Sequence, residues 1–220
     1  MTLTRRLLLG ASGALASPHL ARAQNGAPIR VGEINSYTAQ PAFTLPYRNA
    51  MILAVEGINA RGGVGGRPLE LITRDDAGRP QDAVRLAGEL YNDQKVDVLA
   101  GAFLSNVGLA LSEYAVQNKR LYVGGEPLTD AMVWDRGNRY TFRLRPSTYM
   151  QAAILAEEAA KLPAKRWAVV APNYEYGQSA VKWFRQILTA KRPDVTFVGE
   201  QWPALGRVDA GATVQALEGM

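Results

Sequence analysis

The stretch Val96-Asp97-Val98-Leu99-Ala100-Gly101-Ala102-Phe103-Leu104-Ser105-Asn106-Val107-Gly108 decides how the whole chain is interpreted. Its apolar first part predicts a buried strand that stops at Gly101, and a helical pattern follows Ser105. A strand, a small-residue turn and a helix N-terminus place free backbone N–H groups beside a hydroxyl, which suits a bound carboxylate. The alternative is that Ser105 only caps its own helix.

Strand and helix patterns alternate on both sides of this stretch. The alternation predicts a parallel α/β sheet with helices on both faces, whose ligands bind at the carboxyl ends of the strands. Four strands are expected in this first unit, at residues 29–34, 69–73, 96–100 and 121–123. A loop from Ser36 to Pro46 is expected before the first helix. The second helix should bury Ala83, Leu86, Ala87, Leu90 and Tyr91.

A second unit begins after residue 140 and repeats the same alternation. Extended segments are expected at 140–144, 167–171 and 195–198, with an alanine-rich helix at 149–162 and another helix around Phe184. Asp209 is expected to cap a last helix over 212–217.

Two local patterns invite a chemical interpretation that their context does not support. The glycine cluster 62–66 follows a helix and precedes a strand, whereas a dinucleotide-binding loop follows a strand and opens a helix. We therefore expect a helix stop and a turn. Asp75 and Asp76 are adjacent, so they predict a turn at a strand end more readily than an acid/base pair.

The N-terminus has the sequence pattern of an export signal. Arg5 and Arg6 precede a short apolar segment, and Ala21-Arg22-Ala23 matches the small-x-small pattern of signal peptidase sites. The apolar segment is shorter than the roughly 20 residues of a membrane anchor. Residues 1–23 are thus interpreted as a twin-arginine-like signal peptide, with the general secretory route as the alternative, and the mature protein is expected in the periplasm.

Composition excludes several classes of catalytic site. The chain has no cysteine and its single histidine, His19, lies in the signal, which leaves no serine–histidine triad, cysteine–histidine pair or usual zinc site. Loss of three signal arginines lowers the formal net charge from +5 to about +2, so no nucleic-acid partner is indicated. We expect no enzyme activity, no metal and no cofactor.

Four segments, in order and at matching spacing, resemble the periplasmic solute-binding proteins of ABC importers, in particular the leucine/isoleucine/valine-binding family. The stretch 56–69 (EGINARGGVGGRPL) resembles the family's helix-stop turn, and Asp75-Asp76 its acidic pair at a strand end. The segment 81–84 is similar to the start of its second helix, and 174–177 (YEYG) to an aromatic-glycine turn of its second lobe.

The resemblance implies the type I periplasmic binding protein fold, in which two Rossmann-like lobes of parallel sheet close on a ligand. Lobe one would span 28–140 and an incomplete lobe two 141–220, because the family's two lobes need more residues than this chain has. The Ser105 hydroxyl and amide would hold the ligand carboxylate, and Tyr176 would close over it. The expected ligand-binding residues are Phe43, Phe103, Ser105, Asn106, Glu126, Thr129, Tyr174 and Tyr176.

The implied function is capture of a small carboxylate-bearing solute, a branched-chain or related amino acid, for delivery to an ABC permease in the inner membrane. The aromatic residues equally allow an aromatic acid or amide as the ligand, or they pack in the core. A ligand sensor for a membrane receptor is the alternative role.

Overall fold

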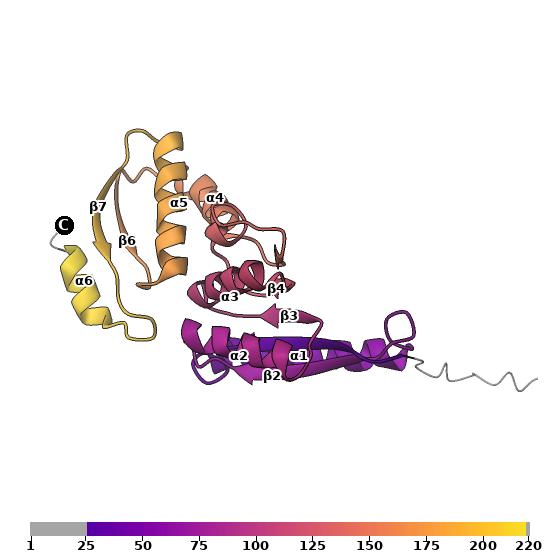
Figure 1. Cartoon of the computed structure of the whole chain (residues 1–220). Helices are drawn as coiled ribbons and strands as arrows, with labels where there is room; N and C mark the ends of the chain where they lie inside the picture. Colours follow the sequence, from indigo (N-terminus) through magenta and orange to yellow (C-terminus); the bar gives the residue numbers. More distant parts are fainter. Residues whose placement is uncertain (1–25, 219–220) are drawn as a thin grey trace, which may run out of the picture.

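The computed structural model describes residues 26–218, so the expected signal peptide lies outside the described residues. Helices and strands alternate along the chain, and Figure 1 shows them in two groups, one around β1–β4 and the other around β6, β7 and α5. The elements are β1 (Ile29–Asn35), α1 (Pro41–Ala60), β2 (Leu69–Asp75), α2 (Pro80–Asn92), β3 (Val98–Gly101), α3 (Ser105–Asn118), β4 (Tyr122–Gly124), the 3₁₀-helix η1 (Asp130–Met132), β5 (Thr141–Arg143), α4 (Thr148–Ala159), β6 (Arg166–Val170), α5 (Glu175–Lys191), β7 (Thr196–Gln201) and α6 (Ala210–Glu218).

The first sheet has five parallel strands in the order β2-β1-β3-β4-β5. Because all five strands run parallel, their carboxyl ends meet at one edge of the sheet. In register, Val31 of β1 pairs with Val98 of β3, and Leu99 with Tyr122 of β4. The expected parallel α/β sheet is confirmed.

The main core lies between this sheet and helices α2 and α3. The five residues predicted for the inner face of α2 are all buried, which confirms the helical periodicity. Gly32 of β1 lies so close to α2 that a Cβ there would meet Leu90 Cδ1 at 3.1 Å. Leu99, Leu111 and Tyr122 are fully buried in the same cluster. Burial of these apolar side chains is what stabilises the first sheet.

The second sheet is smaller and contains two parallel strands, β6 and β7, among the described residues. Helices α4 and α5 pack on each other, and their core centres on Ala156, Leu188 and Val195 with Phe184 and Phe197 beside them. Ala212 N donates to the Asp209 carboxylate at 2.9 Å, which confirms the predicted cap of α6.

Two predictions about the first unit are wrong. Helix α1 begins at Pro41, inside the predicted loop, and continues through Pro46. Pro41 suits the first helical turn because an N–H at that position would have no partner within the helix. The first unit has five strands instead of four, since Thr141–Arg143 hydrogen-bonds in parallel with β4. The division of the chain into lobes near residue 140 stays a prediction, with β5 at its border.

The glycine cluster 62–66 and the pair Asp75-Asp76 both form turns. Asp75 Oδ1 accepts a hydrogen bond from Ala77 N, and Asp76 Oδ1 accepts one from Gly78 N at 2.7 Å, the pattern of an aspartate-stabilised turn. Helix α1 ends at Ala60, and the glycines that follow have positive φ. Both arrangements are as predicted.

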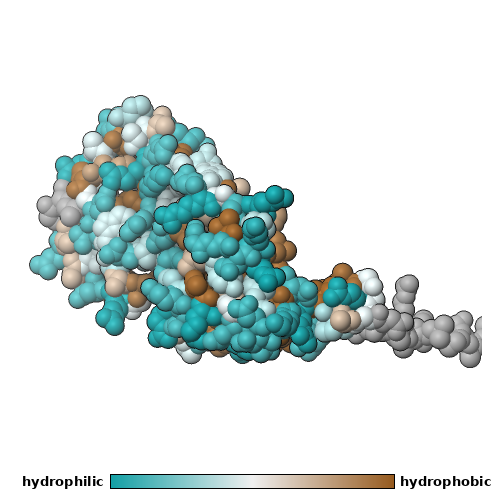
Figure 2. All heavy atoms as spheres, viewed as in Figure 1, coloured by the Kyte–Doolittle hydropathy of each residue, from teal (hydrophilic) through white to brown (hydrophobic). Residues whose placement is uncertain are grey.

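The surface in Figure 2 shows hydrophobic residues interspersed among hydrophilic ones over most of this face. Among residues 26–218, none of the helices combines the length and apolar character needed to cross a membrane.

Candidate ligand-binding site

The turn after β3 is shaped by two consecutive residues with positive φ, Gly101 at 104° and Ala102 at 60°. A Cβ on Gly101 would lie 2.4 Å from the Ile34 carbonyl oxygen, so only glycine fits there. The turn is bonded to both neighbours: Ala102 N donates to Ile34 O at 2.7 Å, and Gly125 N donates to Gly101 O at 2.9 Å. These bonds place the start of α3 at the carboxyl edge of the sheet.

Ser105 is the first residue of α3 and is 1% exposed. The capping interpretation is wrong, because the N-cap is Leu104 and no side chain caps this helix. Instead, the Ser105 hydroxyl oxygen accepts hydrogen bonds from the backbone N–H groups of Leu128 and Thr129, each at 3.3 Å. Its own hydrogen remains available to donate, and a carboxylate is a suitable acceptor.

A cavity of about 310 Å³ opens beside Ser105, between the carboxyl edge of the first sheet and the N-terminal ends of α4 and α5. It brings together six of the eight predicted residues from four separate segments. Its lining residues are Phe43, Phe103, Ser105, Glu126, Leu128, Arg145, Gln151, Tyr174 and Tyr176.

Two aromatic pairs contribute much of the apolar lining. The rings of Phe43 and Phe103 stack with centroids 5.0 Å apart and planes at 18°. Tyr174 and Tyr176 lie 6.1 Å apart at 38°. Burial, with a smaller effect of Tyr176, raises the pKa of Tyr174 to about 12, so this phenol is neutral at physiological pH. Phe43 is 58% exposed, which makes it an accessible apolar surface rather than a core residue.

One ion pair lies in the cavity wall. Arg145 Nη1 lies 3.5 Å from Glu126 Oε1, with the side chain of Glu126 11% exposed and that of Arg145 46% exposed. Burial raises the pKa of Glu126, and the charge of Arg145 opposes that shift. The cavity therefore presents one cation and one partly buried carboxylate.

A buried acidic cluster lies near Glu126 on the sheet side. Glu33, Asn35 and Asp76 are fully buried at the ends of β1 and β2. The Tyr37 hydroxyl donates a hydrogen bond to Glu33 Oε2, and Ser36 Oγ donates to Asp76 Oδ1 at 2.7 Å. Burial raises the pKa of Glu33 to about 7, against the opposing hydrogen bonds from Tyr37 and Asn35.

Two predicted site residues do not line this cavity. Asn106 lines a neighbouring hollow with Glu113 and Arg136. Thr129 is fully buried, and its hydroxyl donates to Glu175 Oε1 at 2.6 Å. Their contact with a ligand stays a prediction.

Three lining residues, Leu128, Gln151 and Arg145, were not among the predicted ligand-binding residues. Leu128 lies in the same loop as the predicted Glu126 and Thr129, so its neighbours indicate it, whereas Gln151 is an ordinary helical position with no signal of its own. Arg145 comes two residues after β5, so assigning β5 to the first sheet would have placed it at the ligand-binding edge.

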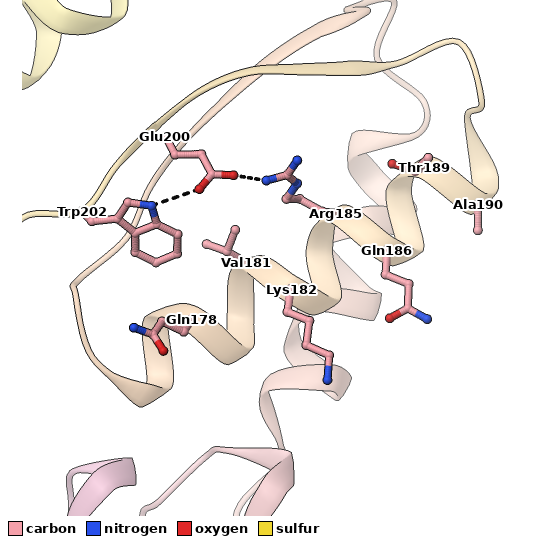
Figure 3. Close-up of a pocket in the computed structure, with 9 residues that line it drawn as sticks. All are labelled: Gln178, Val181, Lys182, Arg185, Gln186, Thr189, Ala190, Glu200 and Trp202. Atoms are coloured by element: carbon pink, nitrogen blue, oxygen red, sulfur yellow. Dashed lines mark hydrogen bonds and ion pairs between the residues drawn. The ribbon is translucent and has the colours of Figure 1, made fainter. Parts of the chain in front are cut away.

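A larger groove lies between α5 and the end of β7, shown in Figure 3. Three of its side chains bond one another: Arg185 pairs with Glu200, and Trp202 Nε1 donates to Glu200 Oε2 at 3.0 Å. It contains no predicted site residue and lies away from the carboxyl edge of the first sheet, so it is not the candidate site. The described residues also hold no cluster of three acidic or histidine side chains suited to a metal ion.

Comparison with known proteins identifies the family of this chain. The sequence profile of the family described as "Periplasmic binding protein" matches residues 28–219. The chain belongs to this family. An "Amino acid binding protein" of Pseudomonas aeruginosa is 30% identical over 155 residues, which cover 69% of this chain and 41% of that one. A Leu/Ile/Val-binding protein of Rhizobium johnstonii is 29% identical over 74% of this chain and 45% of its own length.

The fold agrees with solved members of the family. A solute-binding protein of an ABC transporter from Rhodopseudomonas palustris, in complex with 3,4-dihydroxybenzoic acid, superposes with a TM-score of 0.77 at 27% identity. The match covers 88% of this chain and 52% of that structure. The chain thus spans about half the length of the relatives it matches, and it has the α/β architecture of type I periplasmic binding proteins.

Proposed function

We propose that the protein captures a small carboxylate-bearing solute for an ABC importer, delivers it to a permease of the inner membrane and performs no chemistry on it. The observation that carries this proposal is the cavity in which Ser105 and the aromatic residues meet. The hydroxyl of Ser105 and the amides at the start of α3 supply donors for an anion. The aromatic rings supply walls that exclude water from it.

An amino acid is one candidate ligand, supported by the names of the Pseudomonas and Rhizobium relatives. Its ammonium group needs an acidic partner. Glu126 is the carboxylate that lines the described cavity, and it faces Arg145.

An aromatic acid is the second candidate, supported by the stacked Phe43 and Phe103 rings. Flat aromatic ligands gain from offset stacking on such rings. The related Rhodopseudomonas protein was crystallised with 3,4-dihydroxybenzoic acid, which is a ligand of this class.

The proposal includes export of the protein to the periplasm. The signal-like residues 1–23 would carry the protein to the periplasm, where solute capture for an importer takes place.

Titration calorimetry of the purified protein tests the proposal. Leucine, isoleucine, benzoate and 4-hydroxybenzoate represent the two ligand classes, and choline serves as a control without a carboxylate. Saturable binding of a member of either class supports the proposal. Absence of binding across both classes contradicts it.

A further inference from the structure

Two arginines follow each other closely at the end of β5 and differ in surroundings. The side chain of Arg143 is 8% exposed, and its Nη1 donates to the carbonyl of Thr129 at 3.0 Å and lies 3.9 Å from Asp130. Arg143 is thus part of the folded framework. Arg145, two residues later, lines the cavity with its side chain about half exposed.

Arg145 has donors to spare. Among residues 26–218, its recorded polar contact is the one between Nη1 and Glu126 Oε1, at 3.5 Å. A charge-assisted bond between a guanidinium and a carboxylate is normally about 2.7–2.9 Å long, and the group has five N–H donors. The guanidinium is therefore only loosely bound to Glu126. Arg145 is also the positively charged residue among the nine that line the cavity.

Glu126 is placed differently from Arg145. Its Oε2 atom is buried on the side of Asn35, whereas Oε1 faces Arg145. Oε1 is therefore the carboxylate atom that a ligand ammonium group could reach. A zwitterionic amino acid would have to compete with Arg145 for Oε1, whereas a simple carboxylate would gain Arg145 as a partner.

From this contrast we propose that Arg145 selects the charge of the ligand, by binding the carboxylate of an aromatic monocarboxylate that bears no ammonium group. Glu126 is a positioning residue that holds the guanidinium at the cavity wall in the empty protein. The planar fork of Arg145 bonds both carboxylate oxygens, while the stacked Phe43 and Phe103 rings contact the apolar body of the ligand. This inference rests on the proposed function, whose ligand class it narrows.

Titration calorimetry with benzoate and its neutral isostere benzamide tests the assignment. The wild-type protein should prefer benzoate by about tenfold or more, because the amide cannot form the charge-assisted pair. Arg145→Gln should sharply reduce that preference, leaving only the part due to Ser105 and the α3 amides, and should keep benzamide affinity within about twofold. Arg139→Gln, an exposed arginine outside the cavity, is the matched control with the same charge change and should behave as wild type. Thermal melts establish that each variant is folded.

Glu126→Gln separates the ligand-binding role of Arg145 from the positioning role of Glu126. It should bind benzoate at least as tightly as wild type, because Arg145 no longer has a competing carboxylate. If Arg145→Gln keeps the preference for benzoate, the assignment of Arg145 is overturned. If leucine binds and is lost in Glu126→Gln but not in Arg145→Gln, Glu126 is an ammonium partner and the inference fails while the proposed function stands. A wild-type protein that binds none of these probes overturns both.

Discussion

The hydroxyl of Thr129 donates a 2.6 Å hydrogen bond to the carboxylate of Glu175. Thr129 belongs to the loop after β4, and Glu175 is the first residue of α5, so this bond joins the two parts of the fold beside the cavity. The same hydroxyl accepts a bond from Ala131 N at 3.3 Å. Thr129 thus links the elements that surround the site.

Thr129→Val should lower the free energy of unfolding by about 1–2 kcal/mol, because it removes a buried hydrogen bond to a charged group. Chemical denaturation measures this change. Thr196→Val is the matched control: that hydroxyl is exposed and donates at 3.5 Å to Lys165 O, so its loss should have little effect. Equal stability of both variants would show that the link to Glu175 contributes nothing.

Gly101→Ala should destabilise the protein by about 2 kcal/mol or more, because the added Cβ would clash with the Ile34 carbonyl oxygen. Thermal melts check the loss. Gly88→Ala in α2 is the control, since a Cβ there meets nothing within 4 Å and alanine favours a helix. That variant should be slightly more stable than wild type. A tolerated Gly101→Ala would mean that the turn after β3 can relax.

Ser105→Ala should weaken binding of a carboxylate ligand by about 1–3 kcal/mol, because it removes a donor to a charged group and an acceptor for two loop amides. Titration calorimetry with the ligand found for the wild type measures it. Ser112→Ala is the control, since Ser112 is also buried and hydrogen-bonded, to Thr141 and Asn138, but lies outside the cavity. Ser112→Ala should lower the stability of the protein and leave its affinity for the ligand unchanged. If Ser112→Ala weakens binding and Ser105→Ala does not, Ser105 is not part of the binding site.

Glu33 should make stability fall as pH rises. Its pKa in the folded protein is about 7, above the ordinary value of 4.5, so its contribution is fully present below pH 4.5 and is lost as pH rises through 7. The groups that face it are Tyr37, Asn35, Asp76 and Glu126. Glu33→Gln should therefore stabilise the protein at pH 8, by up to about 3 kcal/mol, and should have little effect at pH 4.

Urea denaturation at pH 4, 6 and 8 gives the Glu33 profile. Glu56→Gln, which changes an exposed carboxylate on α1, should retain the wild-type pH dependence. A Glu33→Gln variant whose stability follows the wild type at every pH would mean that Glu33 ionises freely in the folded protein.

The periodic parts of the fold could be predicted from sequence. The buried face of α2 follows from its apolar spacing, and β3 follows from an apolar run that ends at glycine. The start of α1 could not be predicted in this way, because proline is read as a loop residue although it fits a first helical turn. Strand β5 is only three residues long, and its pairing with β4 is a non-local contact that no local pattern records.

The candidate site was likewise predicted only in part from the sequence. Ser105 was predicted because it follows a strand end in an α/β pattern, where ligands bind, whereas Phe43, Tyr174 and Tyr176 were predicted from the resemblance to the family. Arg145 was missed because its place depends on the pairing of β5. Glu33 was missed because a strand carboxylate is normally exposed, and only the folded structure brings Tyr37 over it.

The Ser105 hydroxyl accepts both loop amides, so bonds within the fold itself hold the α3 side of the cavity as a template. An incoming solute would meet this template already assembled, with little ordering entropy still to be lost there. Adjustment would then fall on the tyrosine side, so substitutions at Tyr174 or Tyr176 would alter how long a solute stays more than how fast it arrives.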